Sequence, residues 1–312
     1  MNKDVVACKK TKVAMIGAGR VGITAAYTMF LKNTAHEIML FGRDKEKLIG
    51  EQLDLMHSLS FMGPSEITVG EDLSQLEGSD VIVFTAGAAQ EKGETRLDLV
   101  KKNTAIIESM IPDIIKYAPD SIILMVTNPV DVLTYKTALL TKFPRGRVFG
   151  SGTTLDTARF RFHLSEFLDV NPKSVHAYIL GEHGDSSFPT LSSANVGGQL
   201  ISTLKNFTEQ NAMDAYKKAR DAAYKIIAAK GATYYAIGVV INQLVEAILS
   251  DAKRVYPLSI PLEGEYGESN VALSVPCVLG RNGVERVIEI PLSDEERLKL
   301  KLSVETLQKF NS

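Results

Sequence analysis

The stretch that decides the fold is KVAMIGAGRVG, Lys12 to Gly22, which runs directly into the helical segment Ile23 to Lys32. A β-rich run, G-x-G-x-x-G and a helix follow one another as in dinucleotide-binding βα units. The three glycines permit the tight turn, the approach of a pyrophosphate, and close packing of helix on strand. Free N–H groups at the helix N-terminus favour phosphates. The stretch therefore predicts a dinucleotide site, with a merely tight βα turn as the alternative.

The segments that follow alternate between strand and helix as far as residue 150. Their β-type runs lie at 37–41, 67–69, 80–85 and 121–126. This alternation predicts an α/β fold with a Rossmann-type doubly wound parallel sheet. Helices over 211–230, 233–250 and 293–310 and strands over 255–260, 271–279 and 284–290 predict an α+β part after it. We expect a dinucleotide-binding domain over residues 1–150 and a catalytic, substrate-binding domain over 151–312.

The end of the second strand lacks an expected acid. A NAD-binding fold usually has a carboxylate for the ribose hydroxyls about 20 residues after the last glycine. Here that position is Gly42, followed by Arg43 and Asp44. Without the carboxylate a 2′-phosphate is not repelled, and Arg43 could pair with it. Alternatively, these residues form only a turn in which Asp44 caps the next helix. The sequence leaves NAD and NADP both open.

Two turns follow the carboxyl ends of core strands, where nucleotides bind in doubly wound sheets. The first is Thr85-Ala86-Gly87, and the second contains Asn128-Pro129, whose X-Pro bond can be cis. We expect the Asn128 amide to hydrogen-bond a ligand, with helix capping as the alternative. Residues 88–96, AAQEKGETR, predict a lid loop that carries Arg96. A solvated loop charge is the alternative for Arg96.

One histidine, His183, lies between two glycines in Gly181 to Asp185, after an apolar run. An imidazole suits proton exchange near neutral pH, which makes His183 a candidate catalytic residue. The alternative is a histidine in a surface turn with no catalytic role. Upstream, Asp156 and Arg159 are three residues apart on a predicted helix and share a face. Arg161 points about 200° around the helix from Arg159. An intrahelical ion pair and a solvated arginine are the alternatives here.

Together these groups describe a hydride-transfer site for a 2-oxo acid. We expect Arg159 to hold the carboxylate with two parallel hydrogen bonds. Arg96, brought in by lid closure, is expected to stabilise negative charge on the carbonyl oxygen. His183 would deliver the proton, and Asp156 would orient the imidazole and favour its charged form. The candidate cofactor-binding residues are Gly17, Gly19, Arg20, Val21, Gly22, Arg43, Thr85, Ala86, Gly87 and Asn128.

The composition is that of an ordinary globular protein: 312 residues, 45% hydrophobic, 23% charged, with a net charge of -2. The charge balance lacks the footprint of a nucleic-acid or anionic-membrane binder, so neither partner is expected. Cys8 and Cys277 offer neither a disulfide framework nor zinc spacing, so we expect no metal site and a reducing, cytoplasmic location. Residues 1–11 lack a signal peptide's apolar core, and no apolar run reaches the roughly 18 residues that span a bilayer.

Seven motifs follow in order: GAGRVG at 17–22, TAGAAQEKGETRLDLV at 85–100, TNPVD at 127–131, SGTTLDTARFRF at 151–162, GEHGDSSFP at 181–189, KGATYYAIG at 230–238 and SVPCVLG at 274–280. With them the chain resembles the L-lactate/L-malate dehydrogenase family, in particular its bacterial lactate enzymes, over essentially its full length. The resemblance implies the site roles given above, places Asn128 at nicotinamide and substrate, and adds Thr233 and Ile237 as pocket residues. It also implies a homotetramer. A non-catalytic nucleotide sensor or a scaffolding oligomer is disfavoured because no site residue is missing.

Substrate choice is expected to depend on Gln90 in the lid. The resemblance implies that the family's malate enzymes have an arginine at this position, which pairs with the second carboxylate of their substrate. A neutral glutamine suits pyruvate, because oxaloacetate would bury an unpaired charge. The resemblance thus favours L-lactate dehydrogenase, with L-malate dehydrogenase or a broader L-2-hydroxyacid dehydrogenase as alternatives.

Arg161 and His176 match the positions at which bacterial lactate enzymes activated by fructose 1,6-bisphosphate hold that anion. Because Arg161 faces away from Arg159, a separate anion site at a subunit interface is physically reasonable. We therefore hypothesise activation by this sugar bisphosphate.

Overall fold

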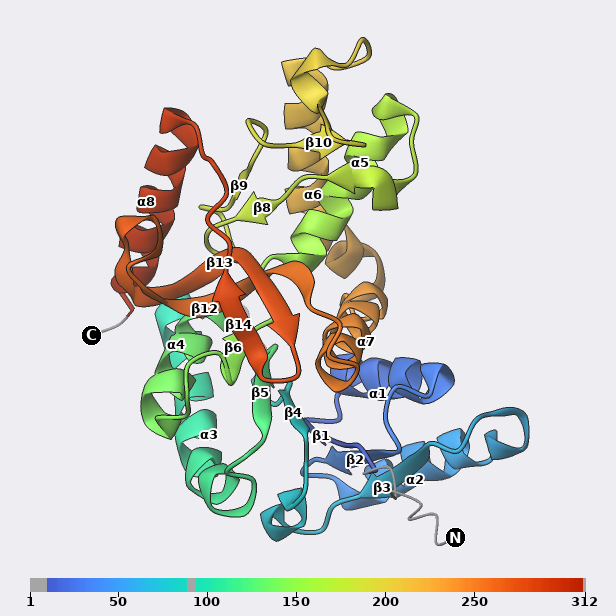
Figure 1. Ribbon diagram of the computed structural model, residues 1–312. Coiled ribbons are helices and arrows are strands. Elements are labelled where there is room, and N and C mark those ends of the chain that lie inside the picture. The colour runs from blue at the N-terminus through green and yellow to red at the C-terminus, as the bar shows by residue number, and fades with distance from the viewer. Residues whose placement is uncertain (1–9, 89–93, 311–312) are drawn as a thin grey trace, which may run out of the picture.

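The structure is a computed structural model that describes residues 10–88 and 94–310 (Figure 1). Its main sheet contains β1 (Lys12–Ile16), β2 (Glu37–Phe41), β3 (Glu66–Val69), β4 (Val81–Phe84), β5 (Ile122–Met125), β6 (Val148–Gly150), β12 (Arg254–Glu263), β13 (Ser269–Gly280) and β14 (Gly283–Val287). The helices are α1 (Arg20–Lys32), α2 (Lys45–Met56), α3 (Arg96–Tyr117), α4 (Val130–Thr141), α5 (Thr154–Leu168), α6 (Glu209–Lys230), α7 (Tyr235–Leu249) and α8 (Asp294–Gln308). Short strands are β7 (Val175–His176), β8 (Ile179–Leu180), β9 (Phe188–Pro189), β10 (Asn195–Val196) and β11 (Gln199–Leu200). Short 3-10 helices are η1 (Leu59–Phe61), η2 (Leu73–Leu76), η3 (Pro172–Ser174), η4 (Ile201–Thr203) and η5 (Glu265–Gly267).

The first six strands form a parallel sheet in the order β6-β5-β4-β1-β2-β3. This is the doubly wound strand order, so the predicted Rossmann-type fold is confirmed. Side chains alternate between the faces of the sheet. Val13 and Met15 pack in the core that contains the inner faces of α1 and α7, whereas Ala14 and Ile16 pack with α3 and α4 (Figure 1). Both faces of the sheet are therefore covered, which explains why its central strands are uniformly apolar.

The sheet does not end with the alternating βα segments. β12 pairs antiparallel with β6 through Ser259 and Gly150, and β13 and β14 extend the sheet further. The three strands were expected, but their union with the parallel sheet was not, because strand pairing over a hundred residues leaves no local pattern. The domain boundary expected at residue 150 stays a prediction, and the sheet runs across it.

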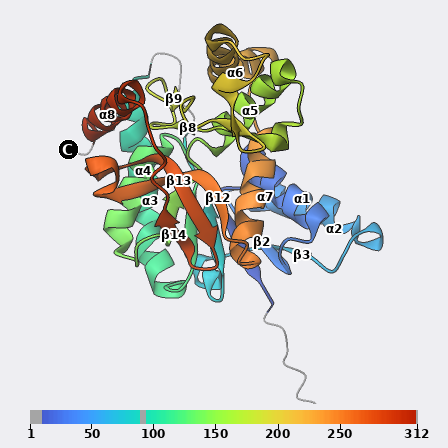
Figure 2. The ribbon, with the colours of Figure 1, turned by 45° about the horizontal axis from the view of Figure 1, so that its top comes forward.

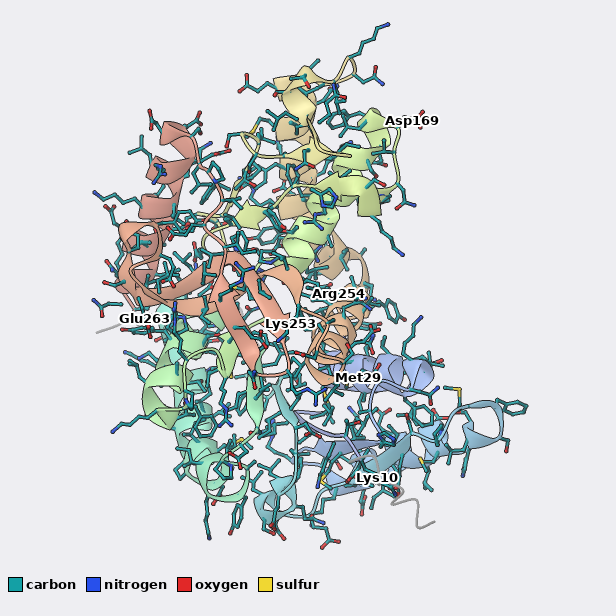
Figure 3. All side chains as sticks on the ribbon, in the orientation of Figure 1. Lys10, Met29, Asp169, Lys253, Arg254 and Glu263 are labelled. Atoms are coloured by element: carbon teal, nitrogen blue, oxygen red, sulfur yellow. The ribbon has the colours of Figure 1, made fainter. Side chains whose placement is uncertain are left out.

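The second part of the chain adds a separate small core. Phe160 and Leu164 of α5 pack there against Ala212 and Ala215 of α6. Figure 2 shows α5 and α6 beside each other, above the sheet and away from α2. Exposed acids such as Asp169 and Glu263 lie at the periphery (Figure 3). No helix in the described part of the chain is long and apolar enough to cross a membrane.

One helix boundary corrects the sequence analysis. We expected Arg96 in a lid loop, but Arg96 is the first residue of α3. Thr95 caps α3, and its hydroxyl and the Asp98 carboxylate form a reciprocal capping box. The spacing Thr-x-x-Asp was a readable signal for this start. A second capping box, between Ser293 and Glu296, begins α8, and this helix was expected over 293–310.

Candidate active site

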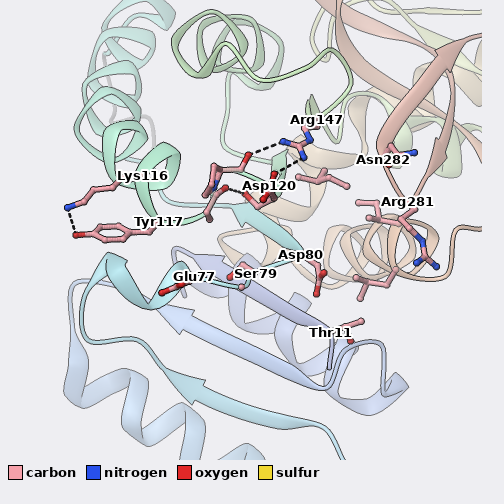
Figure 4. A pocket seen from close by; sticks show the side chains of 17 residues that line it. Thr11, Glu77, Ser79, Asp80, Lys116, Tyr117, Asp120, Arg147, Arg281 and Asn282 are labelled. Carbon is pink, nitrogen blue, oxygen red and sulfur yellow. Dashed lines mark hydrogen bonds and ion pairs between the residues drawn. The ribbon is translucent and has the colours of Figure 1, made fainter. Parts of the chain in front are cut away.

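Two cavities lie toward the carboxyl ends of the parallel strands. The glycine-turn cavity, about 710 Å³, is lined by the turn after β1 and by Thr85, Ala86 and Gly87 after β4. The histidine cavity, about 340 Å³, is lined by His183, Asp156 and other residues of the second part of the chain. A third cavity, about 990 Å³, lies at the opposite edge, beside residues that precede β4 and β5 such as Asp80 and Asp120 (Figure 4). Since nucleotides bind at carboxyl ends of such sheets, the first two cavities are the candidate site.

The glycine turn is shaped so that side chains cannot occupy it. Gly17 has φ +102°, and a Cβ there would lie 2.4 Å from the Ala86 nitrogen. A Cβ on Gly22 would lie 2.1 Å from the Gly17 oxygen, whereas one on Gly19 would meet nothing within 4 Å. Gly19 therefore leaves open space in front of the first turn of α1, where free N–H groups favour an anion. This cradle fits the pyrophosphate of a dinucleotide.

A buried asparagine that the sequence analysis missed connects this turn to the second one. Asn103 accepts a hydrogen bond from the Ala88 N–H at 2.7 Å and donates one to the Asn128 carbonyl at 2.8 Å. Asn128 itself precedes a cis peptide bond to Pro129 and lines the histidine cavity. The available signal was a polar residue in the apolar stripe of α3 formed by Leu99, Val100 and Ile107. Asn103 therefore fixes the two strand-end turns relative to each other.

Gly42, Arg43 and Lys47 also line the glycine-turn cavity, at the end where the sequence analysis expects the adenosine ribose. Asp44 caps α2, and its carboxylate accepts a hydrogen bond from the Lys47 N–H at 3.1 Å, so the predicted N-cap is confirmed. A Cβ on Gly42 would meet the Leu48 side chain at 3.4 Å, an ordinary contact. The backbone therefore does not demand glycine at this position. Two acids, Glu71 and Asp72, also line this cavity.

His183 is held by its backbone and by its ring. Gly181, with φ +87°, bridges to Ser274 of β13 and turns the chain after β8. The His183 N–H donates to Asp131 Oδ2 at 2.7 Å, and ring Nδ1 lies 2.6 Å from Asp156 Oδ2. Asp131 is a second missed residue: it is buried in the first turn of α4, within the TNPVD motif. Two carboxylates therefore determine where the imidazole lies.

The charges of this cluster depend on one another. Burial favours the neutral imidazole, but the carboxylates of Asp156 and Asp131 outweigh burial and raise the pKa of His183 to about 9. Burial opposes ionisation of Asp156 as well, yet His183 and Arg159 hold its pKa below the ordinary value. For Asp131, the effect of burial exceeds that of the hydrogen bonds to the carboxylate and raises its pKa to about 6. The histidine is thus kept protonated at neutral pH and can donate a proton.

Arg159 lies beside this pair in the same cavity. Its Nη1 donates to Asp156 Oδ1 at 3.2 Å, so the intrahelical ion pair that the sequence analysis gave as the alternative is present. Its Nη2 is buried and has no hydrogen-bond partner among the described residues. An unpaired buried guanidinium nitrogen is costly unless an acceptor binds it. Arg159 therefore suits an anionic ligand such as a carboxylate.

Of the other expected site residues, some line the histidine cavity, one lies outside the described residues, and two arginines line neither cavity. Val21, Asn128, Thr233 and Ile237 line the histidine cavity. Gln90 lies outside the described residues. Arg96 is not among the residues that line either cavity; its guanidinium instead forms an ion pair with the buried carboxylate of Glu182. Arg20 is exposed at the start of α1, with Nη1 near Gly231.

Arg161 and His176, the expected anion pair, lie outside both cavities. The Arg161 Nε donates to the Ala177 carbonyl at 2.8 Å, and its guanidinium stacks over the Tyr178 ring, 5.0 Å from the centroid. His176 is exposed in β7. Arg161 is thus held against the segment that directly follows β7, and its partners there are Ala177 and Tyr178.

Family models and curated relatives match this chain over nearly its full length. Residues 11–150 match the family model of the lactate/malate dehydrogenase NAD binding domain, and residues 153–311 that of the α/β C-terminal domain. An L-lactate dehydrogenase of Thermoanaerobacterium saccharolyticum is 47% identical over 302 residues, 95% of this chain and 97% of that one. One from Acetivibrio thermocellus is 46% identical over 304 residues, 96% of each chain.

Two solved structures superpose closely on this chain. They are the minor L-lactate dehydrogenase from Enterococcus mundtii (TM-score 0.94, 37% identity) and a lactate dehydrogenase enzyme from a Medee basin deep-sea metagenome library (TM-score 0.93, 38% identity). Each match covers 97% of this chain and 98% of the other. Because the two family models together match almost all of the chain, and because its curated relatives are nearly half identical, the chain belongs to the lactate/malate dehydrogenase family.

Proposed function

We propose that this protein is an L-lactate dehydrogenase that interconverts pyruvate and L-lactate. The observation that carries the proposal is the contact of His183 with Asp156 beside the unpaired Nη2 of Arg159, all in one cavity. The high identity to several L-lactate dehydrogenases supports it further.

Each group has one role in pyruvate reduction. Arg159 binds the substrate carboxylate through its guanidinium and so orients the carbonyl carbon. His183, protonated at neutral pH, donates its proton from Nε2 to the carbonyl oxygen, and Asp156 holds the ring and stabilises the imidazolium. Arg96 stabilises the developing negative charge once it leaves Glu182. A bound nicotinamide dinucleotide supplies or accepts the hydride.

The glycine-turn cavity would hold that cofactor. The turn Gly17 to Gly22 would bind the pyrophosphate, and Thr85 to Gly87 would border the adenosine half, with Asn128 at the nicotinamide end. The NAD binding domain of the family includes all of these residues. Because Gly42 replaces the acid and Arg43 and Lys47 line the same end, we propose that NADP is also accepted.

The substrate assignment is tested with initial rates of pyruvate and oxaloacetate reduction, each measured with NADH and NADPH. We expect pyruvate to be the better substrate, because Gln90, Thr233 and Ile237 offer no cation for a second carboxylate. A preference for oxaloacetate would support the alternative, L-malate dehydrogenase. Equal rates with longer aliphatic 2-oxo acids would support a broader L-2-hydroxyacid dehydrogenase.

We also propose that fructose 1,6-bisphosphate activates the enzyme through Arg161 and His176. Two observations support this site: His176 is exposed, and Arg161 is hydrogen-bonded to the carbonyl of Ala177, the residue that follows His176. The expected result is a lower half-saturating pyruvate concentration in the presence of the effector, and loss of that response in His176→Asn. Pyruvate saturation curves that do not change at millimolar effector, at several pH values, would refute it.

The assembly is proposed to be a homotetramer. Large apolar side chains are between 46% and 66% exposed on three helices: Tyr27 and Leu31 on α1, Ile49 and Leu53 on α2, and Tyr235 and Val239 on α7. Such an apolar surface favours association with another chain. Sedimentation equilibrium should give four chain masses, and a monomer at micromolar concentration would contradict the proposal.

A further inference from the structure

The ion pair between Arg96 and Glu182 joins the start of α3 to the turn that contains His183. Arg96 begins α3, whereas Glu182 directly precedes His183. The Glu182 side chain is 1% exposed, and it is absent from the lining of the histidine cavity. While Arg96 contacts Glu182, its guanidinium is therefore outside the cavity in which a substrate would bind.

Glu182 is built into this position by its neighbours. Its Oε2 accepts hydrogen bonds from the Ser186 hydroxyl at 2.5 Å and the Ser186 N–H at 3.2 Å. A Cβ on Gly184 would lie 2.7 Å from the carboxylate, so the glycine after His183 leaves room for Glu182. Ser303 of α8 closes the network by donating to the Ser186 carbonyl at 2.6 Å.

The second carboxylate oxygen depends on Arg96. Oε1 accepts no hydrogen bond within the described residues, and Arg96 provides the charge that compensates it. A buried carboxylate without such a partner is strongly disfavoured. The other contact of this guanidinium is the ring of Phe310, whose centroid lies 5.5 Å from Cζ. Glu182 and Phe310 thus hold Arg96 among residues that do not line the histidine cavity.

We propose that Glu182 is a positioning residue that competes with the substrate for Arg96. This inference rests on the proposed function, in which Arg96 contacts the carbonyl oxygen. Each binding event must then separate Arg96 from Glu182, so only the fraction of molecules with a released Arg96 binds at full affinity. The pair lowers apparent substrate affinity and keeps the arginine out of the histidine cavity until substrate binds.

The experiment measures the affinity of oxamate, a non-reducible 2-oxo acid analogue, for the enzyme–NADH complex in a double-mutant cycle. Glu182→Gln preserves acceptance from Ser186 but removes the charge that holds Arg96. We expect oxamate to bind about fivefold more tightly, with a matching fall in the pyruvate KM. In an Arg96→Gln background the same change should alter affinity less than twofold.

Two further variants keep the inference open to refutation. Phe310→Leu removes the ring beneath Arg96 without touching Glu182 and should tighten oxamate binding about twofold. Glu296→Gln, a matched change at a buried carboxylate that accepts from Ser192, should leave oxamate affinity unchanged. Unchanged or weaker binding in Glu182→Gln, or equal changes in both backgrounds, would overturn the inference. Failure of oxamate to bind the wild-type complex would instead contradict the proposed function.

Discussion

The two ends of the candidate site are built in opposite ways. At the substrate end, Asp156 is hydrogen-bonded to both His183 and Arg159, and the charges of the cluster lower the pKa of Asp156 and raise that of His183. At the adenosine end, Arg43 is exposed and Gly42 has room for a larger side chain. Buried, interlocked charges cannot change singly without leaving a partner uncompensated, whereas exposed groups can. Reaction chemistry should therefore tolerate little change, and cofactor preference should be adjustable.

The largest effect is expected from His183→Asn. Asparagine cannot supply a proton, so kcat for pyruvate reduction should fall by about 10³-fold, while NADH binding is unchanged. Steady-state rates and a fluorescence titration with NADH measure the two quantities. Turnover within tenfold of wild type would show that the buried cluster does not carry the proton transfer.

A somewhat smaller effect is expected from Arg159→Lys. Lysine keeps the charge but loses the fork that binds a carboxylate through two nitrogens, so kcat/KM for pyruvate should fall by about 10²-fold. Arg220→Lys is the matched control, because Arg220 lines the same cavity but its side chain is 41% exposed and pairs with Asp221. Equal losses in both variants would contradict the assignment of Arg159 as the residue that binds the substrate carboxylate.

The coupling within the cluster should be visible in pH profiles. Because Asp156 contributes to raising the pKa of His183 to about 9, pyruvate reduction should persist to alkaline pH and decline through that value. Lactate oxidation, which needs the neutral imidazole, should rise over the same range. Asp156→Asn should move both limbs to lower pH and reduce kcat/KM by about tenfold or more. Profiles that stay in place would mean that Asp156 does not set the charge of His183.

The smallest effect is expected at the adenosine end. In Gly42→Asp, a carboxylate would accept hydrogen bonds from the ribose hydroxyls and repel a 2′-phosphate. The ratio of kcat/KM with NADH to that with NADPH should rise by about tenfold, with kcat on saturating NADH unchanged. A large loss of kcat would contradict the independence of the two ends, and an unchanged ratio would show that residue 42 does not contact the ribose.

Much of this molecule can be predicted from local patterns. The glycine spacing at Gly17, Gly19 and Gly22 predicts the turn, and the structure shows two of these positions closed to any side chain. Helical spacing alone predicts that Asp156 and Arg159 meet. The start of α3 was misplaced because the Thr95–Asp98 capping box was overlooked.

By itself the sequence determined the doubly wound fold, the glycine turn, the Asp156–Arg159 contact and the reaction class, because each is encoded within a few neighbouring residues or in an ordered set of motifs. Only the tertiary structure decided which distant groups meet. Asp131 accepts a hydrogen bond from the His183 N–H, Asn103 donates one to the Asn128 carbonyl, and Arg96 forms an ion pair with Glu182. It also joined β12 to β6 across the expected domain boundary. Such contacts come from packing of segments far apart in the chain, and neither composition nor periodicity records which buried polar group will find which partner.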